Sequence, residues 1–147
     1  LGLEVDAVAG AGAAGGMGAA MMAFLKGQLR PGCEIIAKAV GLDEAVRDAD
    51  LVITGEGRID HQTIFGKTPH GVATVAKRHS KPVIGIAGSL GANAHVVHEH
   101  GLDAITSVLA SICDLSQALA EAEHNVRSSA RNVAALLAMG QGLGLTR

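Results

Sequence analysis

The chain has 147 residues, of which 48% are hydrophobic and 18% are charged, and its formal net charge is −2. This composition argues against a disordered chain, and glycine or charged residues interrupt every apolar run before it reaches the length of a membrane span. Aromatic residues make up only 1% of the sequence. Since nucleic-acid binding relies on base stacking and basic surfaces, we expect a globular protein with neither a nucleic-acid nor a membrane partner.

The two cysteines, Cys33 and Cys113, lie far apart in the sequence, and we expect no signal peptide ahead of them. Disulfide bonds are characteristic of secreted proteins, whereas cytoplasmic cysteines usually stay reduced. We therefore expect two reduced cysteines and a cytoplasmic location.

Residues 3–9 are compatible with a half-exposed strand or an extended entry. The glycine-rich stretch that follows them, residues 10–18, leads into a predicted helix. Its spacing fits the Gly-x-Gly-x-x-Gly pattern, in which backbone amides and a helix amino end hold a pyrophosphate. The candidate nucleotide contacts there are Gly12, Gly15 and Gly16. No clean strand precedes the pattern, and tight packing of an Ala/Gly-rich helix start explains it equally well.

Two short helices are predicted over residues 33–40 and 42–46, joined at Gly41. They complete a Gly/Ala-rich and helical segment, residues 1–48, which we expect to belong to a second domain or to border one. Residues 49–147 are predicted to form a portion of an α/β domain.

Three apolar runs, residues 51–53, 82–88 and 104–110, alternate with two predicted helices, residues 71–79 and 92–100. The first of these helices is opened by Thr68 and Pro69, because proline is tolerated in the first helical turn. Alternating strands and helices favour right-handed crossovers and a parallel sheet. The expected fold class is α/β, with a parallel sheet flanked by helices in a Rossmann-like arrangement of three layers.

A long last helix is predicted over residues 115–139, with Asp114 as its N-cap and Gly140 at its end. Its apolar stripe consists of Leu115, Leu119, Ala122, Val126, Ala130, Val133 and Leu137.

Polar functional groups converge in residues 54–67, which we interpret as a loop directly after the first strand. Binding sites of α/β proteins lie beyond the carboxyl ends of the strands. Gly55 and Gly57 allow a tight bend and a close approach to a ligand. The loop also provides two anions, two cations and two neutral hydrogen-bonding side chains, namely Glu56, Arg58, Asp60, Gln62, Thr63 and Lys67. This mixture suits an anionic ligand that carries a metal ion.

Two alternatives apply to this loop. Gly66, Lys67 and Thr68 look like the end of a Walker A motif, but position 61, where that motif requires glycine, is His61, so no P-loop is predicted. The charged residues of the loop could instead form an ion network that only stabilises the fold.

The stretch that reads Thr-Gly-Glu-Gly-Arg-Ile-Asp, followed by Gln-Thr, Gly-Lys, Pro69 and Gly-Val-Ala, resembles the signature of the type I (glycerate 2-kinase-like) glycerate kinases. The resemblance extends to residues 10–20, 49–54 and 83–88 and so covers essentially the whole chain. Members of that family are longer, two-domain enzymes. The resemblance therefore implies that the chain is the carboxyl-terminal portion of such a kinase, and that an amino-terminal part is its partner.

The activity implied by the resemblance is ATP-dependent phosphorylation of D-glycerate. Phosphoryl transfer needs cations to neutralise charge, carboxylates to hold magnesium and amides to fix phosphates. We expect catalytic roles for Glu56, Arg58 and Asp60, with Glu56 and Asp60 also holding Mg²⁺. Substrate and phosphate contacts are expected at Gly55, Gly57, Gln62, Thr63 and Lys67. Ser89, which follows the second apolar run, is a further candidate nucleotide contact.

A rival hypothesis is a dinucleotide-binding module without catalysis, built on residues 10–18. The two hypotheses differ in which glycine-rich segment contacts the ligand. The isolated chain is expected to be inactive as a kinase.

Overall fold

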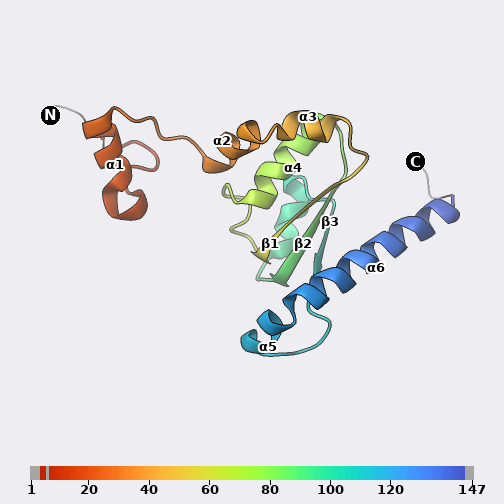
Figure 1. Ribbon diagram of the computed structural model, residues 1–147. Coiled ribbons are helices and arrows are strands. Elements are labelled where there is room, and N and C mark those ends of the chain that lie inside the picture. The colour runs from red at the N-terminus through yellow and green to blue at the C-terminus, as the bar shows by residue number, and fades with distance from the viewer. Residues whose placement is uncertain (1–3, 6, 145–147) are drawn as a thin grey trace. The chain divides into compact units, whose positions relative to one another are not determined.

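The structure, a computed structural model, describes residues 4–5 and 7–144 (Figure 1). The chain divides into two compact units, Leu1–Ile36 and Ala37–Arg147. This division falls ahead of the sequence-based boundary at residue 48. The assignment of the first segment to a second domain stays a prediction.

The first unit is built around helix α1, Ala13–Leu25. Its first turn is not regular, because Ala14, Gly15 and Gly16 have φ angles of 51°, 69° and 92°. The regular helix therefore begins only after Gly16. Of residues 4–5 and 7–9, none is in a strand, so the strand predicted over residues 3–9 is wrong there, while Leu3 and Asp6 lie outside the described residues.

The glycine-rich stretch folds back on the start of α1. The Ala19 amide donates a hydrogen bond to the Ala11 carbonyl oxygen at 2.9 Å. Gly18 is buried, and a Cβ atom at this position would collide with the Gly10 carbonyl oxygen. Close packing within the segment therefore requires a glycine at position 18.

Two short helices follow along the chain, α2 (Gly32–Ala39) and α3 (Leu42–Arg47). Gly41 joins them with a left-handed φ of 65°, as the glycine between the two predicted helices suggested. The prediction of two short helices is confirmed.

The sheet of the second unit has three parallel strands, β1 (Val52–Ile59), β2 (Val83–Leu90) and β3 (Ala104–Ser107), in the order β1-β2-β3. Helix α4, Thr68–Arg78, connects β1 to β2, and a 3₁₀ helix, η1 (Ala94–His100), connects β2 to β3. Figure 1 shows this alternation of strands and helices. The predicted α/β class with a parallel sheet flanked by helices is confirmed.

The main core lies on the face of the sheet that packs against α4. Adjacent strand residues point to opposite faces. On β2, Val83 belongs to this core, while Ile84 faces the groove beside α6. The fully buried side chains of the core include Ile59, Val83, Val97 and Leu102. The other face is less well covered, since Ile53 is 55% exposed.

The predicted long last helix is two helices, α5 (Leu115–Ala120) and α6 (Ala122–Gly142). They are separated at Glu121, whose φ of −97° and ψ of 7° are not helical. Asp114 caps α5 as predicted, because the Gln117 amide donates to its Oδ1 atom at 2.8 Å. Gly140 does not end the helix, which continues to Gly142.

The predicted apolar stripe is not the buried side of α6. The buried residues of that helix are Asn125 and Ser129. Leu115, Leu119, Val126 and Leu137 of the stripe are exposed. The periodicity is present in the sequence, but the described residues supply little to cover it. None of the described helices is long and apolar enough to span a membrane.

Asp103 ties three elements together, and its replacement is expected to change the acid stability of the fold. Its Oδ2 atom accepts hydrogen bonds from Lys77 Nζ and from the Val83 amide, both at 2.6 Å. Partial burial of the carboxylate raises the pKa of Asp103, but these two donors lower it further, so the pKa lies below its ordinary value. The ionised form therefore stabilises the folded chain above the unfolded pKa, and this stabilisation is lost as the pH falls through the folded pKa.

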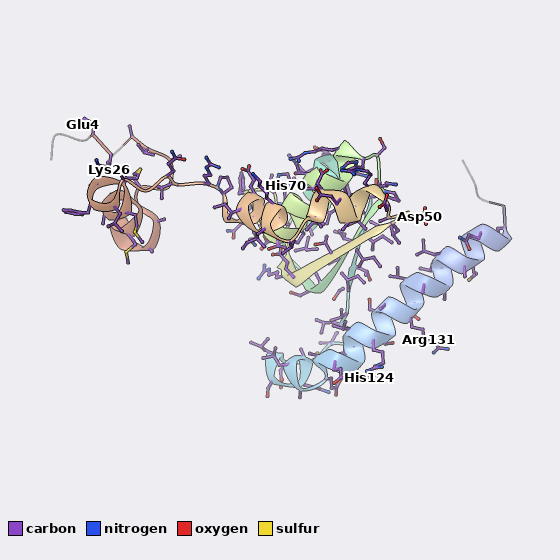
Figure 2. All side chains as sticks on the ribbon, turned by 45° about the horizontal axis from the view of Figure 1, so that its top comes forward. Glu4, Lys26, Asp50, His70, His124 and Arg131 are labelled. Carbon is purple, nitrogen blue, oxygen red and sulfur yellow. The ribbon has the colours of Figure 1, made fainter. Side chains whose placement is uncertain are left out.

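We expect Asp103→Asn to lower the melting temperature at pH 7 by about 2 to 5 °C, because the pair with Lys77 is half exposed and each kcal/mol moves a domain of this size by a few degrees. The difference from wild type should shrink as the pH is lowered below about 4. Calorimetry across this pH range measures it. Asp50→Asn serves as the control, because Asp50 is exposed (Figure 2). A difference that persists at pH 2 would contradict the assignment.

Candidate functional site

Strand β1 extends further than the sequence suggested. Residues Gly55, Glu56, Gly57 and Arg58 lie within the strand and not in a loop, because pairing with β2 continues to Ile59. Two glycines give this stretch a low strand propensity, and the hydrogen bonds to the neighbouring strand override it. The loop prediction therefore holds only from Asp60 onward.

Ser89, expected just after the second apolar run, also lies within a strand, β2. It is the β2 partner of Arg58 in the sheet register. The candidate residues of the two strands are therefore neighbours at the carboxyl end of the sheet. This is the edge where α/β proteins bind their ligands.

Asp60 is the centre of the polar cluster. It is only 8% exposed. Its Oδ1 atom accepts a hydrogen bond from the Gln62 amide at 2.9 Å and lies 3.4 Å from Lys67 Nζ, while its Oδ2 atom lies 3.3 Å from Arg58 Nε. Burial of the carboxylate raises the pKa of Asp60, but the Gln62 amide, Lys67 and Arg58 together lower it below its ordinary value. Asp60 is therefore ionised at neutral pH.

Thr63 lies beneath this cluster and has no exposed surface. Its hydroxyl donates to Glu56 Oε1 at 2.8 Å and accepts from the Asp60 amide at 3.2 Å. Its hydroxyl therefore joins Glu56 to the backbone of Asp60. Binding of substrate or phosphate by Thr63 stays a prediction.

Gly91 completes the cluster, and the sequence-based list of site residues omitted it. Its amide donates to the Ile59 carbonyl oxygen at 2.8 Å. A Cβ atom at this position would lie 2.5 Å from Arg58 Nε and 2.9 Å from the Asp60 Cβ. The absence of a side chain at position 91 is therefore what allows Arg58 to lie against Asp60. A glycine three residues after the second apolar run was the signal that could have revealed it.

The remaining predicted ligand contacts lie in different environments. Gly57 and Gln62 are exposed. Gly55 is exposed as well, but a Cβ atom there would collide with the Ile86 carbonyl oxygen, so its lack of a side chain serves the contact between strands. Lys67 is partly buried and is the N-cap residue of α4.

The amino end of α4 opens beside the cluster. No side chain of the described residues caps its first turn, and Pro69 lies within that turn. The first amides of a helix have no partner within the helix, and the helix dipole places partial positive charge there. Together with Lys67 and Arg58, this end of the helix makes the surroundings of Asp60 favourable for an anion.

A sequence model described as the glycerate kinase family matches residues 1–138. The chain belongs to the glycerate kinase family. This confirms the resemblance inferred from residues 54–67.

Several bacterial relatives support the assignment to this family. It is 57% identical over 138 residues to the glycerate 2-kinase of Escherichia coli K12, covering 94% of this chain and 36% of that protein. It is 52% identical to the glycerate kinase of Halalkalibacterium halodurans over 134 residues, 91% of this chain and 35% of that protein. A crystal structure from Salmonella typhimurium LT2, assigned as a glycerate kinase 2, is 59% identical with a TM-score of 0.70, over 90% of this chain and 34% of that one. The chain thus spans about a third of the length of these relatives.

The described residues do not offer a complete magnesium site. Both carboxylate oxygens of Asp60 already have partners, namely Arg58, Lys67 and the Gln62 amide. One oxygen of Glu56 accepts the Thr63 hydroxyl. No group of three or more His, Cys, Asp or Glu residues that could hold a metal ion occurs in residues 4–5 and 7–144. The expectation that Asp60 is a direct ligand of Mg²⁺ does not fit this arrangement.

The glycine-rich segment lacks the setting of a dinucleotide site. The Gly-x-Gly-x-x-Gly pattern acts between a strand and a helix. None of residues 4–5 and 7–9 forms a strand, and Gly15 and Gly16 have left-handed backbones. The rival dinucleotide-binding hypothesis therefore has no support from the described part of this segment.

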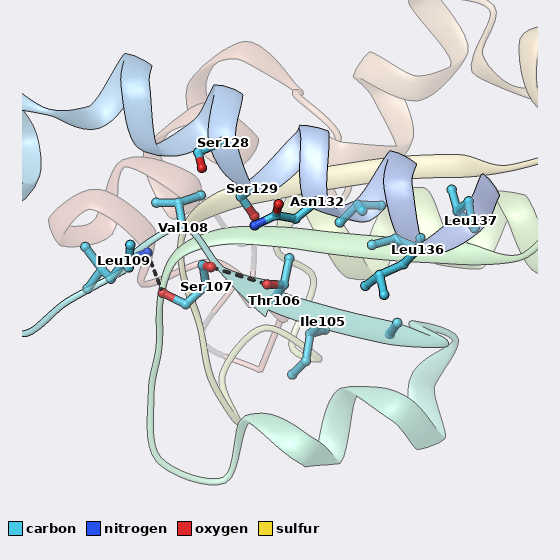
Figure 3. Close-up of a pocket in the computed structure, with 14 residues that line it drawn as sticks. Ile105, Thr106, Ser107, Val108, Leu109, Ser128, Ser129, Asn132, Leu136 and Leu137 are labelled. Atoms are coloured by element: carbon cyan, nitrogen blue, oxygen red, sulfur yellow. Dashed lines mark hydrogen bonds between the residues drawn. The ribbon is translucent and has the colours of Figure 1, made fainter. Parts of the chain in front are cut away.

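A separate groove of about 560 Å³ lies between β3 and α6. Figure 3 shows Thr106 and Ser107 of β3 on one side of it and Ser129, Asn132 and Leu136 of α6 on the other. None of the residues around Asp60 lines this groove. It follows the less covered face of the sheet rather than its carboxyl edge.

We expect Gly91→Ala to displace the Arg58 side chain and to destabilise the chain by about 1 to 3 kcal/mol, the usual effect of overpacking. A crystal structure shows the displacement, and denaturant unfolding measures the stability. Gly140→Ala is the matched control, because a Cβ atom there meets nothing within 4 Å and alanine favours the helix. An unchanged Arg58–Asp60 distance in Gly91→Ala would contradict the steric argument.

Proposed function

We propose that the full-length protein containing this chain transfers the γ-phosphoryl group of ATP to D-glycerate, giving phosphoglycerate and ADP. The observation that carries the proposal is the cluster of Arg58 and Lys67 around ionised Asp60, at the carboxyl edge of a parallel sheet in a glycerate kinase family member. The names of the relatives, glycerate kinase and glycerate 2-kinase, support the choice of glycerate as acceptor.

Arg58 and Lys67 are the groups proposed to bind anionic oxygens. The Arg58 side chain is 61% exposed and contacts Asp60 through Nε. Lys67 is 37% exposed. In phosphoryl transfer the enzyme mainly positions the reactants and neutralises charge on the transferred group. Asp60 holds both cations in place for this task.

Glu56 is the proposed acceptor of the proton from the glycerate hydroxyl. Its side chain is partly buried, and one carboxylate oxygen is engaged by Thr63. The other oxygen is proposed to face the substrate. As the hydroxyl oxygen forms its bond to the γ-phosphorus, the proton passes to the Glu56 carboxylate and the bond from phosphorus to ADP breaks.

The amino end of α4 is a proposed phosphate contact. Free amides and the helix dipole favour an anion there by about 0.3 to 1 kcal/mol. Gly55, Gly57 and Gln62 are proposed as further substrate contacts, and Ser89 of β2 as a nucleotide contact. Contacts from Gly12, Gly15 and Gly16 to the nucleotide stay proposals of the same kind.

We propose that magnesium reaches the site with ATP as its phosphate-bound partner, since the oxygens of Asp60 are already engaged. A cytoplasmic location is proposed as well. It is supported by the free thiols of Cys33 and Cys113.

The remainder of the full-length protein is the proposed partner of the open sheet. Parallel sheets are usually covered on both faces, whereas Ile53 of β1 is 55% exposed. The chain spans 36% of the length of the glycerate 2-kinase relative, so most of such a protein lies outside it. That part is proposed to cover the exposed face and to supply the rest of the substrate cleft.

We therefore expect the 147-residue chain by itself to show little or no glycerate phosphorylation, while the full-length protein is active. A coupled assay of ADP release with D-glycerate, ATP and magnesium measures both. The chain alone should also bind a dye for apolar surfaces, and the full-length protein should not. Turnover by the chain alone near about 1 per second, ordinary for a kinase, would show that the site is already complete.

In the full-length protein, we expect Arg58→Ala to lower kcat/KM by about 10- to 1000-fold, or about 1.4 to 4 kcal/mol of transition-state stabilisation. The melting temperature should fall by only a few degrees, because Arg58 is 61% exposed and Asp60 keeps Lys67 and the Gln62 amide as partners. Steady-state kinetics and calorimetry on one preparation measure both quantities.

The matched control is Arg131→Ala, because Arg131 is exposed on α6 (Figure 2) and should affect neither quantity. If Arg58 only braces the strand end, the melting temperature of Arg58→Ala will fall while kcat/KM stays close to wild type. That result would defeat the catalytic assignment.

A further inference from the structure

Thr63 links the two carboxylate residues of the candidate site through one buried hydroxyl. We propose that Thr63 is a positioning residue that holds Glu56 in the orientation in which it accepts the substrate proton. This inference rests on the proposed function, because it assigns to Thr63 an effect that passes through Glu56.

The hydrogen-bond partners of the Thr63 hydroxyl determine where its proton points. A threonine hydroxyl has one proton to donate and can accept from other donors. The Asp60 amide donates to Thr63 Oγ1 at 3.2 Å, so this amide occupies an acceptor position. The single proton of the hydroxyl then points to Glu56 Oε1 at 2.8 Å. Because Thr63 is 0% exposed, no solvent competes for either bond.

The turn that carries Thr63 is itself closed by Asp60. The Thr63 amide donates to the Asp60 carbonyl oxygen at 3.0 Å, and the Gln62 amide donates to Asp60 Oδ1 at 2.9 Å. One short turn therefore directs the Asp60 carboxylate toward its cations and the Thr63 hydroxyl toward Glu56. The same turn therefore positions the Asp60 carboxylate beside its cations and the Glu56 carboxylate through Thr63.

Loss of this hydroxyl should free the Glu56 side chain. An unrestrained glutamate samples several rotamers, and only some of them place the carboxylate near the substrate hydroxyl. The effect should appear in kcat, because orientation of the proton acceptor matters in the transition state. The KM for ATP should change little, because the buried Thr63 hydroxyl is already engaged by Glu56 and the Asp60 amide.

Two substitutions separate the hydroxyl from the volume of the side chain. Thr63→Val keeps the shape and removes both hydrogen bonds, whereas Thr63→Ser keeps the hydroxyl and removes a methyl group. In the full-length protein, Thr63→Val is expected to lower kcat by about 10- to 100-fold, the effect of a small misplacement of a catalytic group. Thr63→Ser is expected to stay close to wild type. If Thr63→Val does not fold, Thr63→Ala takes its place.

A double-mutant cycle with Glu56→Gln tests whether Thr63 acts through Glu56. In the Glu56→Gln background, Thr63→Val should lower kcat by no more than about twofold, because the residue through which it acts has already lost its function. A residue with a merely structural role would give losses that multiply. Multiplicative losses, or a wild-type kcat for Thr63→Val, would overturn the proposal.

Crystal structures of Thr63→Val and Thr63→Ser give a measurement that does not depend on activity. The Glu56 carboxylate should move in the valine variant and keep its place in the serine variant. If the wild-type protein does not phosphorylate glycerate, the proposed function fails and these structures still decide the positioning role. A Glu56 carboxylate that stays in place in Thr63→Val would overturn it.

Discussion

A carboxylate that is 8% exposed can stay ionised only if partners replace the water it has lost, and Asp60 meets this condition with three donors. The Gln62 amide comes from the turn that follows the strand, Lys67 comes from the start of α4, and Arg58 comes from β1. The charge of Asp60 thus draws the strand, the turn and the helix end together. Without it, Arg58 and Lys67 would lie close to each other and to the positive end of α4, with no anion between them. The positive charge of Arg58, Lys67 and the amino end of α4 also makes the surroundings of Asp60 suitable for a phosphate or a carboxylate ligand.

The close contact of β1 with the end of β2 makes this arrangement possible. Arg58 and Ser89 are partners in the register, and Gly91 packs directly against Arg58 and Asp60. A side chain at position 91 would occupy the space that the guanidinium group needs. Gly91 therefore serves both the packing of the backbone and the placement of the Arg58 side chain in the site. The two faces of the sheet are covered unequally. One face carries the core around Ile59 and Leu102, whereas the other is covered only in part, by α6.

Membership of the glycerate kinase family explains this imbalance. The chain spans about a third of relatives such as the glycerate 2-kinase of Escherichia coli, at 36% of its length. The exposed stripe of α5 and α6, with Leu119 and Val126, has a sequence period suited to burial but little to bury it among the described residues. The amino-terminal part proposed from the resemblance is the natural candidate to cover it.

Local sequence patterns were sufficient to predict several structural elements of this protein. The apolar runs predicted the three parallel strands, and Pro69 predicted the start of α4. Gly41 predicted the connection between α2 and α3, and Asp114 predicted the N-cap of α5. Each is a preference that acts within a few residues, so a sequence pattern can reveal it. The tertiary structure decided the rest. Strand β1 continues through two glycines because β2 pairs with it. Thr63 is buried because the turn that carries it folds beneath Glu56. Gly91 matters because its neighbours are Arg58 and Asp60, more than thirty residues earlier in the sequence. Contacts between segments that are distant in sequence leave no local pattern, which is why only the fold could show which polar residues meet and which of them are accessible to a substrate.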